Sequence, residues 1–496
     1  MRRDSTSRLL PDDEASETLP ANQTMTSSVS RIKDKCPFII INLIVVLLGA
    51  SGRFHTPVLV QYLYQRYADE IFGNASVKTS SHPCINESSA SSKEESKLKE
   101  VQEMTSDMLF FLNLTNYCPG IFTCLILGAF SNRISRKLQL AIPMCGYLTK
   151  CVVIAVVVGF NLHVNWFFLG FAVQGALGDT CGVFLGIFLY TTDITPRDKT
   201  RTLAMSIVEG FRGFVAAGLN VVTGHLIQRL GFNIPALLSV GLALISLVIT
   251  FMLPAREAQH QYTLVDDDCH RWNNWWRRLI SPFTRIREAR VRKLVLVGFI
   301  AFLFAMAASV GITVIESVYL MNIPFCFDAI TLGWYKFGRE LAFNGFLVVA
   351  VPLFYNSLPG MWLAILGSLS AICGMVMYST ATKPAEVYAI IGLMIGEALP
   401  VNIIRGETSR LLASETQGPL LAVFAMLENI GYVMGIPALH VYRATLGFFK
   451  QLVCVVCASV TAVNIGFLLY YQVTWKRHLL DVQSNKIRQR SYDAIN

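Results

Sequence analysis

Long apolar runs alternate with short polar segments over most of this chain, and this alternation predicts membrane-spanning helices. Each run contains about the 20 residues that a helix needs to cross roughly 30 Å of hydrocarbon. Because a bilayer offers no partner for an exposed backbone amide, helices are the expected element throughout. We predict an all-α membrane protein with twelve transmembrane helices at residues 37–63, 107–130, 138–159, 165–191, 203–226, 232–253, 294–320, 330–355, 360–381, 386–405, 419–440 and 448–472.

A polar and then basic segment in the middle of the chain separates two sets of six predicted spans. This layout is typical of secondary transporters built from repeated halves. The expected divisions are a cytosolic disordered tail at 1–35, an N-terminal six-helix bundle at 36–253 with an outer loop at 70–106, a cytosolic central loop at 254–293, a C-terminal six-helix bundle at 294–474 and a cytosolic tail at 475–496.

Composition supports a lipid environment and argues against a nucleic-acid partner. Hydrophobic residues make up 53% of the 496 residues and charged residues only 15%. The formal net charge is +9, but Lys and Arg gather in short loops and tails, as the positive-inside rule predicts for cytosolic segments. Both termini should therefore be cytosolic. The aromatic and basic segment at 271–280 is expected to lie on the cytoplasmic leaflet.

The outer loop at 70–106 carries signals of the extracytoplasmic side. Asn74-Ala-Ser and Asn86-Glu-Ser are acceptor sequences for N-glycosylation. Cys84 lies in the same loop, and Cys326 lies in another predicted extracytoplasmic loop. We therefore expect glycans at Asn74 and Asn86.

Several charged residues stand inside the predicted spans of the first half, where one charge costs about 2.5–3.5 kcal/mol on insertion scales. Asp179 lies in a stretch, Gly178–Gly186, whose glycines at four-residue spacing fit close helix packing. Glu209 and Arg212 stand three residues apart, so they share one helix face. These two form either a structural ion pair or, with Asp179, a set of groups that handle protons.

The second half carries further charges deep in its predicted spans, namely Glu316, Arg339, Glu397 and Glu428. Carboxylates and guanidinium groups that face one cavity suit a carrier of anionic solutes. Arg binds carboxylates with a planar fork, and acidic groups offer exchangeable protons. We expect Glu316 and Glu428, together with Arg212 from the first half, to contact the solute.

The turn at residues 128–137 resembles the loop motif between helices two and three of the major facilitator superfamily. Arg133, Arg136 and Lys137 match the basic positions of that motif. Asn132 stands where the family usually has Asp. The resemblance implies a major facilitator fold in which this loop takes part in gating.

Other stretches resemble the solute carrier family that contains the proton-coupled folate transporter and the thymic stromal cotransporter. Their shared order and spacing carry the resemblance, which runs from about residue 36 to residue 475. The stretches are residues 61–67, Leu177–Asp179, residues 192–195, Arg201 with Glu209, and Arg405 followed by Gln417 and Gly418.

This resemblance implies roles for individual residues. The positions of Asp179 and Glu209 are linked to transport in that family, the glutamate to proton coupling. The position of Arg405 is linked to proton and substrate binding. The resemblance also implies a disulfide between Cys84 and Cys326.

The chain departs from the folate carrier at two positions. Phe171 and Ser309 stand where that carrier has an arginine and a histidine, so folate itself is not the assured substrate. Arg212 stands where that carrier is apolar. We hypothesise that Arg212 replaces the missing cation beside Asp179 and Glu209.

These features together predict a secondary active transporter that moves a small organic anion, folate-like or a related conjugate, by alternating access. Protons are the expected coupling ion, without a cofactor or metal, in the plasma membrane or the endolysosomal membrane. Two alternatives stay open: an endolysosomal exporter of peptidoglycan fragments or amphiphilic metabolites, and a non-transporting sensor with the same fold. The sequence contains no hydrolase or metalloprotease motif, so we expect no enzyme activity. It does not predict an oligomeric state.

Overall fold

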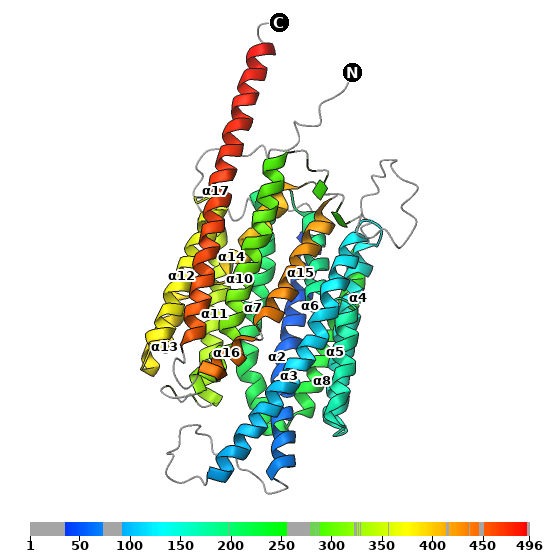
Figure 1. The fold of residues 1–496 in the computed structure, drawn as a ribbon. Helices are drawn as coiled ribbons and strands as arrows, with labels where there is room; N and C mark the ends of the chain where they lie inside the picture. The colour runs from blue at the N-terminus through cyan, green and yellow to red at the C-terminus, as the bar shows by residue number, and fades with distance from the viewer. Residues whose placement is uncertain are drawn as a thin grey trace.

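The structure is a computed structural model, and it describes residues 35–72, 92–196, 198–254, 279–280, 283–284, 286, 288–321, 325, 327, 329–355, 357–412, 416–435, 437–445 and 451–493. Every regular element within these ranges is a helix. The prediction of an all-α protein is therefore confirmed. The long helices run roughly parallel to one another in a single elongated bundle (Figure 1).

The helices up to residue 252 form what we call the N half. They are α2 (Lys35–Phe72), α3 (Ser92–Ala129), α4 (Arg136–Gly159), the 3-10 helix η2 (Val164–Trp166), α5 (Phe167–Ala176), α6 (Asp179–Ile194), α7 (Lys199–Leu230) and α8 (Asn233–Met252). Within this half, α4 packs against α5, α6 and α8, and α2 packs against α7 and α8.

The helices from residue 289 onward form the C half. They are α10 (Ala289–Met321), α11 (Ala329–Phe354), α12 (Gly360–Thr380), α13 (Pro384–Leu393), α14 (Leu399–Leu411), α15 (Gln417–Gly435), α16 (Pro437–Thr445) and α17 (Leu452–Asp493). Here α17 packs against α10 and α12, and α14 packs against the same two helices.

Eleven segments of the described chain are long and apolar enough to cross a membrane. The prediction of a continuous span at 386–405 is wrong, because residues 394–398 form turns between α13 and α14. The prediction of one helix at 419–440 is also wrong. Pro437 begins the separate helix α16, as expected for a residue that has no backbone N–H and cannot continue a helix.

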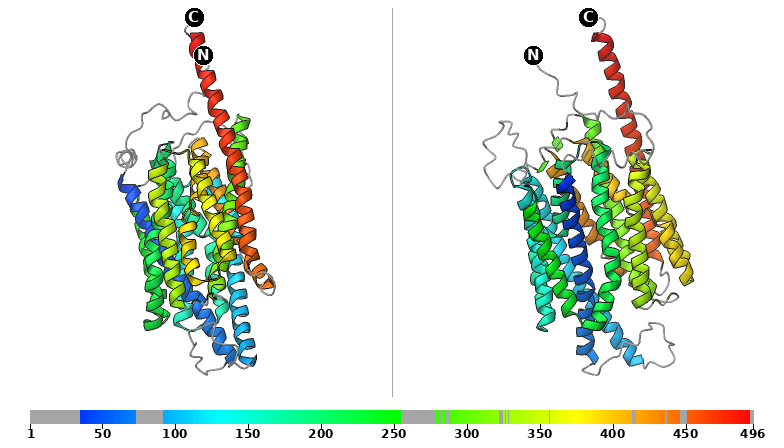
Figure 2. Two further views of the ribbon diagram at one scale, coloured as in Figure 1. Left: turned by 90° about the vertical axis from the view of Figure 1, so that its left-hand side faces the viewer. Right: turned by 180° about the vertical axis from the view of Figure 1, so that it is seen from behind.

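The bundle has one end at which α2 begins and α17 ends, which we call the terminal side (Figure 1). The segment at 475–493, predicted as a tail, continues α17 as a helix beyond the ends of its neighbours (Figure 2). Ion pairs of Arg290 with Asp481 and of His478 with Glu288 join this extension to the start of α10.

The two halves meet through α3 with α15 and through α7 with α11 and α14. Near the terminal side this contact is close. A Cβ at Gly128 would collide with the Ala422 side chain, and a Cβ at Gly418 would collide with Ser131. The halves are therefore in close contact on the terminal side.

Candidate functional site

The fourth helix of the N half is broken where the sequence predicted a continuous span at 165–191. Gly178 has φ 113° and Asp179 has φ 55°, so the backbone turns through the left-handed region between α5 and α6. Glycine adopts this region freely, and Asp is among the few other residues that tolerate it. Gly182 and Gly186 face Pro143 and Leu140 on α4, as the predicted packing face requires.

The break places Asp179 at the boundary between the halves. Its side chain is buried, and Asn116 on α3 donates a hydrogen bond of 2.7 Å to its Oδ1. Its Oδ2 has no hydrogen-bond partner among the described residues. A Cβ at Gly120 would lie 3.2 Å from Asp179 Cβ and 3.4 Å from Oδ1 of Asn429 in the C half. Among the described residues, Asp179 is thus buried without an ion-pair partner.

Glu209 and Arg212 form an ion pair on α7, with Arg212 Nη2 2.5 Å from Glu209 Oε1. The Arg212 guanidinium also lies over the Phe184 ring of α6, 5.1 Å from its centroid. The arginine that we hypothesised as a replacement cation therefore contacts Glu209 directly, whereas Asp179 is bonded to Asn116.

Arg405 on α14 makes the second ion pair of the site, with Nη2 2.7 Å from Glu428 Oε2 on α15. Its guanidinium lies over two rings, 4.5 Å from the centroid of Phe188 in the N half and 5.2 Å from that of Phe302 in the C half. The cation is therefore held by one carboxylate and two aromatic faces.

These residues form one electrostatic unit. The Glu428 carboxylate interacts with Arg405, Glu209, Arg212 and Asp179. We call these five residues, contributed by α6, α7, α14 and α15, the central cluster. It contains residues of both halves, so a relative movement of the halves would change its contacts.

Two tyrosines that the sequence did not single out lie beside the central cluster. The rings of Tyr117 on α3 and Tyr432 on α15 stack with centroids 5.1 Å apart and an interplanar angle of 10°. Both tyrosines interact electrostatically with Glu428. A stacked pair that bridges the halves offers a flat apolar surface next to charged groups, which suits a planar organic anion.

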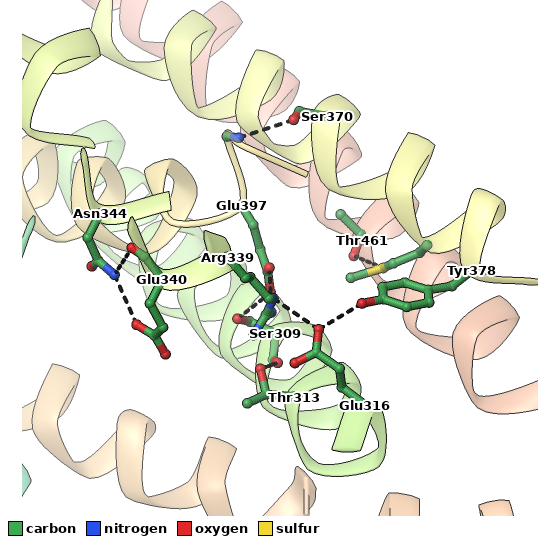
Figure 3. Close-up of polar contacts among 12 residues, drawn as sticks. Ser309, Thr313, Glu316, Arg339, Glu340, Asn344, Ser370, Tyr378, Glu397 and Thr461 are labelled. Atoms are coloured by element: carbon green, nitrogen blue, oxygen red, sulfur yellow. Dashed lines mark hydrogen bonds and ion pairs between the residues drawn. The ribbon is translucent and has the colours of Figure 1, made fainter. Parts of the chain in front are cut away.

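Glu316 does not lie in the central cluster, although the sequence grouped it with the solute-binding residues. Arg339 Nε is 3.1 Å from Glu316 Oε1, and Arg339 Nη2 is 3.0 Å from Glu397 Oε2. Figure 3 shows Arg339 between the two carboxylates. Ser309 donates a 2.8 Å hydrogen bond to Glu397 Oε1, and Tyr378 donates one of 2.7 Å to Glu316.

Tyr335 completes this group with hydrogen bonds to Glu316 and Tyr378. The group is a second set of buried polar residues inside the C half. We call it the C-half cluster, and its members are Ser309, Glu316, Tyr335, Arg339, Tyr378 and Glu397. All of its charged members are at least nine-tenths buried.

Comparison with known proteins identifies the family to which this architecture belongs. The profile of the Major Facilitator Superfamily matches residues 39–436. The chain belongs to the Major Facilitator Superfamily. The rat (Rattus norvegicus) proton-coupled folate transporter is 24% identical over 396 residues, covering 79% of this chain and 83% of the transporter. The human (Homo sapiens) lysosomal proton-coupled steroid conjugate and bile acid symporter SLC46A3 is 24% identical over 400 residues, covering 79% and 85%. These relatives confirm the resemblance to the folate-transporter family.

Solved structures support the same major facilitator fold. The human organic anion transporter MFSD10 (TETRAN) superposes with a TM-score of 0.64 at 11% identity, covering 91% of this chain and 100% of that one. The transporter FucP in its outward conformation gives a TM-score of 0.61 at 14% identity, with 88% and 98% covered. The predicted fold class is confirmed.

The loop between the second and third helices of this major facilitator is tied to two other helices. Arg136 Nε is 2.7 Å from Asp193 Oδ2 at the end of α6, and Arg136 Nη1 donates a 2.6 Å hydrogen bond to the Ser131 carbonyl. Lys137 Nζ donates to the Phe251 carbonyl at the end of α8. Arg133 and Asn132 are exposed on the same turn. The loop thus links the ends of α6 and α8 on the terminal side of the N half.

A cation also remains near Phe171, supplied by a helix that the sequence reasoning passed over. Lys150 on α4 is buried, with its Nζ 5.2 Å from the centroid of Phe171 and 5.3 Å from that of Tyr147. Its amine interacts electrostatically with Asp179. A lysine in the middle of an apolar run was the signal that could have identified it.

A further ion pair crosses the boundary between the halves. Arg53 Nη2 on α2 is 3.1 Å from Glu340 Oε2 on α11, and both side chains are about one-quarter exposed, at 28% and 27%. Glu340 also interacts electrostatically with Arg212 of the central cluster. This carboxylate therefore faces two arginines of the opposite half.

Some predicted sites lie outside the described residues. They are Cys84, Cys326, Asn74 and Asn86, together with the basic and aromatic segment at 271–278. Within the described ranges, no group of three or more His, Cys, Asp or Glu side chains is arranged to hold a metal ion.

Proposed function

We propose that this major facilitator is a proton-coupled carrier of a small organic anion, folate-like or a related conjugate, that works by alternating access. Its curated relatives are named as proton-coupled transporters of folate and of steroid conjugates and bile acids. Folates and conjugates of this kind combine a rigid apolar body with an anionic group. The central cluster supplies partners for both parts.

The observation that carries this proposal is the buried Arg405–Glu428 pair between two aromatic rings. A substrate carboxylate and Glu428 compete for the same guanidinium. Protonation of Glu428 removes the competing charge, so a proton and an organic anion favour the same bound state. Arg suits this exchange because its planar fork accepts one carboxylate in place of another.

Asp179 and Glu209 are the proposed proton-handling residues around this exchange. Asp179 has one carboxylate oxygen without a partner among the described residues, so a proton can be added there without breaking an existing hydrogen bond. Glu209 is held by Arg212. Protonation lowers the cost of burying these carboxylates when the halves close around the substrate.

Basic loop residues indicate the orientation of the carrier. We propose that the terminal side faces the cytosol, because the basic loop residues Arg133, Arg136 and Lys137 lie there. The close contacts of Gly128 and Gly418 then form the cytosolic gate. The disulfide between Cys84 and Cys326 and the glycans at Asn74 and Asn86 remain predictions for the opposite side.

Uptake measured with a small panel of labelled compounds tests the function. Cells expressing the full chain are given radiolabelled folate, a bile acid or a steroid sulfate at acidic and at neutral pH, with and without a protonophore. We expect uptake of at least one compound that is faster at acidic pH and falls with the protonophore. Equal uptake at both pH values, unaffected by the protonophore, would contradict proton coupling.

A second candidate concerns the membrane rather than the chemistry. One group of relatives is named as lysosomal, so the same carrier could empty the lumen of an endolysosome into the cytosol. The sequence patterns that fit sorting signals, at Leu9-Leu10 and Tyr262, lie outside the described residues. Surface biotinylation of the tagged chain distinguishes the two locations, because only a plasma-membrane carrier is labelled in intact cells.

A further inference from the structure

The C-half cluster has no task in the proposed exchange at Arg405, yet it buries three charged side chains. Glu316, Arg339 and Glu397 are 2%, 7% and 7% exposed. Breaking a buried ion pair by removal of one partner is strongly destabilising, whereas apolar replacements of a whole pair are often harmless. Stability alone therefore does not require these charges, and a role in ion handling would account for them.

Glu397 lies at the break in the fourth helix of the C half. Residues 394–398 form turns between α13 and α14, and the Glu397 side chain points from this break toward α10 and α11 (Figure 3). Broken membrane helices are a common place for substrate and coupling-ion sites, since backbone groups freed at the break line a cavity. The break also begins the helix that carries Arg405.

A small cavity with a mostly apolar lining adjoins Glu397 and a few other polar residues. Its volume is about 20 Å³, and its polar lining consists of Glu397, Ser309, Ser368, Thr461 and Asn464. A cavity needs about 10–15 Å³ and two or more polar partners to hold one water molecule. This cavity meets both requirements, in the interior of the C half between α10, α12, α14 and α17.

Asn464 provides an independent sign of a bound group. Its side chain is 0% exposed, and neither its amide nitrogen nor its amide oxygen has a hydrogen-bond partner among the described residues. A buried polar group that lacks a hydrogen-bond partner destabilises the folded state. The amide lines the same cavity as Glu397, so a water molecule there can bond to both.

Glu397 shares its cationic partner with a second carboxylate. One guanidinium, Arg339, serves two carboxylates, Glu397 and Glu316. The remaining groups that interact with these carboxylates come from the neighbouring helices, and they are Lys336 and Tyr335 on α11, Tyr378 on α12, and Cys454 and Cys457 on α17. Lys336 interacts with Glu316 and also with Glu340, so its charge is divided between the two.

We propose that Glu397, together with the Asn464 cavity, is a second protonation site of this carrier, separate from the central cluster. A proton on Glu397 leaves Arg339 paired with Glu316 alone, and a cavity water accepts a hydrogen bond from the protonated carboxyl group. Glu397 lies two residues before α14, so a change in its protonation can move the helix that carries Arg405. The role in transport rests on the proposed function, whereas the protonation itself does not.

Infrared difference spectroscopy of the purified full-length protein tests the proposal without a substrate. Spectra are recorded across a pH series in the carbonyl-stretch region of protonated carboxyl groups. We expect Glu397→Gln to remove one pH-dependent band of the wild-type protein. Glu407→Gln is the matched control, since Glu407 belongs to an ion pair with Arg410 near the terminal side, and it should leave that band unchanged. A Glu397→Gln spectrum identical to the wild-type spectrum would overturn the proposal.

Asn464→Leu provides a second variant that keeps the carboxyl group and fills the cavity. Loss of the amide and of the cavity water removes the proposed hydrogen-bond acceptor of the protonated Glu397 carboxyl group. We expect the Glu397 band to shift in frequency. An unchanged band in Asn464→Leu would refute the part played by the cavity, even if Glu397→Gln removes the band.

The proposed function and the second protonation site at Glu397 can each fail without the other. If Glu209→Gln abolishes proton-driven uptake while the Glu397 band persists, both the proposed function and the second site stand. If no compound shows proton-driven uptake but Glu397→Gln still removes a band, the second site stands and the proposed function fails. The converse result, with uptake present and no band assigned to Glu397, rejects the second site alone.

Discussion

Asp179 and Glu397 lie at the breaks in the fourth helix of the N half and of the C half, but their surroundings differ. Asp179 accepts a hydrogen bond from Asn116 and lies beside Gly120 and Asn429 at the boundary between the halves. Glu397 is bonded to Arg339 and Ser309 within its own half. One carboxylate therefore changes its surroundings when the halves move, and the other keeps them.

This difference suggests that the two carboxylates have different roles in a fold of two similar halves. A group at the boundary can couple its protonation to the opening and closing of the carrier, because closure changes its exposure. A group held inside one half can set the shape of that half. Substitutions in the two regions test this difference between a carboxylate at the boundary and one inside a single half.

Removal of Arg339 should have the largest effect, and it should act on stability. Arg339→Leu leaves Glu316 and Glu397 buried without a cation, which we expect to cost about 3–5 kcal/mol. The measurement is the thermal stability of the purified protein followed by size-exclusion chromatography. The double variant Arg339→Leu with Glu397→Leu should recover part of the loss. A single variant as stable as the wild type would contradict a rigid interior cluster.

Removal of Arg405 should act on transport as well as on stability, because it also leaves the buried Glu428 without its cation. Arg405→Leu removes the guanidinium that we propose as the substrate anchor, and a lost hydrogen bond to a charged group is worth about 1.5–3 kcal/mol, or roughly ten- to a hundredfold in affinity. We expect at least such a loss in uptake at equal surface expression. Arg410→Leu is the matched control on the same helix, and its uptake should stay close to that of the wild type.

Neutralisation of Asp179 should change the pH dependence of uptake. Asp179→Asn resembles the protonated carboxyl group, so uptake should no longer rise as the external pH falls. The expected loss at acidic pH is about tenfold, which corresponds to 1.4 kcal/mol. Uptake by cells at several pH values measures it. A variant that keeps the full acid stimulation of the wild type would show that Asp179 does not carry the coupling proton.

The smallest effect is expected for the partly exposed ion pair of Arg53 with Glu340. Pairs of this exposure contribute about 0.2–1 kcal/mol, so Arg53→Gln and Glu340→Gln should each change the KM of uptake only a few-fold. The double variant should lose no more than either single variant, because both remove the same contact. Fully additive losses would mean that the two residues do not interact across the boundary during transport.

The sequence was sufficient to predict the class of fold and the charged residues of the site. Apolar runs of spanning length identify most of the helices, and a charge within such a run marks Asp179, Glu209, Arg212 and Glu428. The family resemblance adds Arg405, and the structure brings these five residues together. The spacing of Glu209 and Arg212 was enough to predict that they share a face, because both lie on one helix.

Contacts between helices were not predictable in the same way. Arg339 pairs with Glu316 and Glu397, and Arg53 pairs with Glu340. These pairs depend on how α2, α10, α11 and α14 pack, which no local spacing specifies. The helix breaks have a similar origin. A Cβ at Gly396 would lie 2.9 Å from the Gly367 Cα, so the turn before α14 is fitted to α12.

Simultaneous measurement of proton flux and substrate flux tests whether this carrier moves protons together with its organic anion. The purified full-length chain is reconstituted in vesicles that contain a pH-sensitive dye, and radiolabelled folate, a bile acid or a steroid sulfate is added outside at acidic pH. We predict that a transported compound enters together with protons, and that Arg405→Leu abolishes both fluxes. Entry of the compound without acidification of the vesicle interior would contradict it.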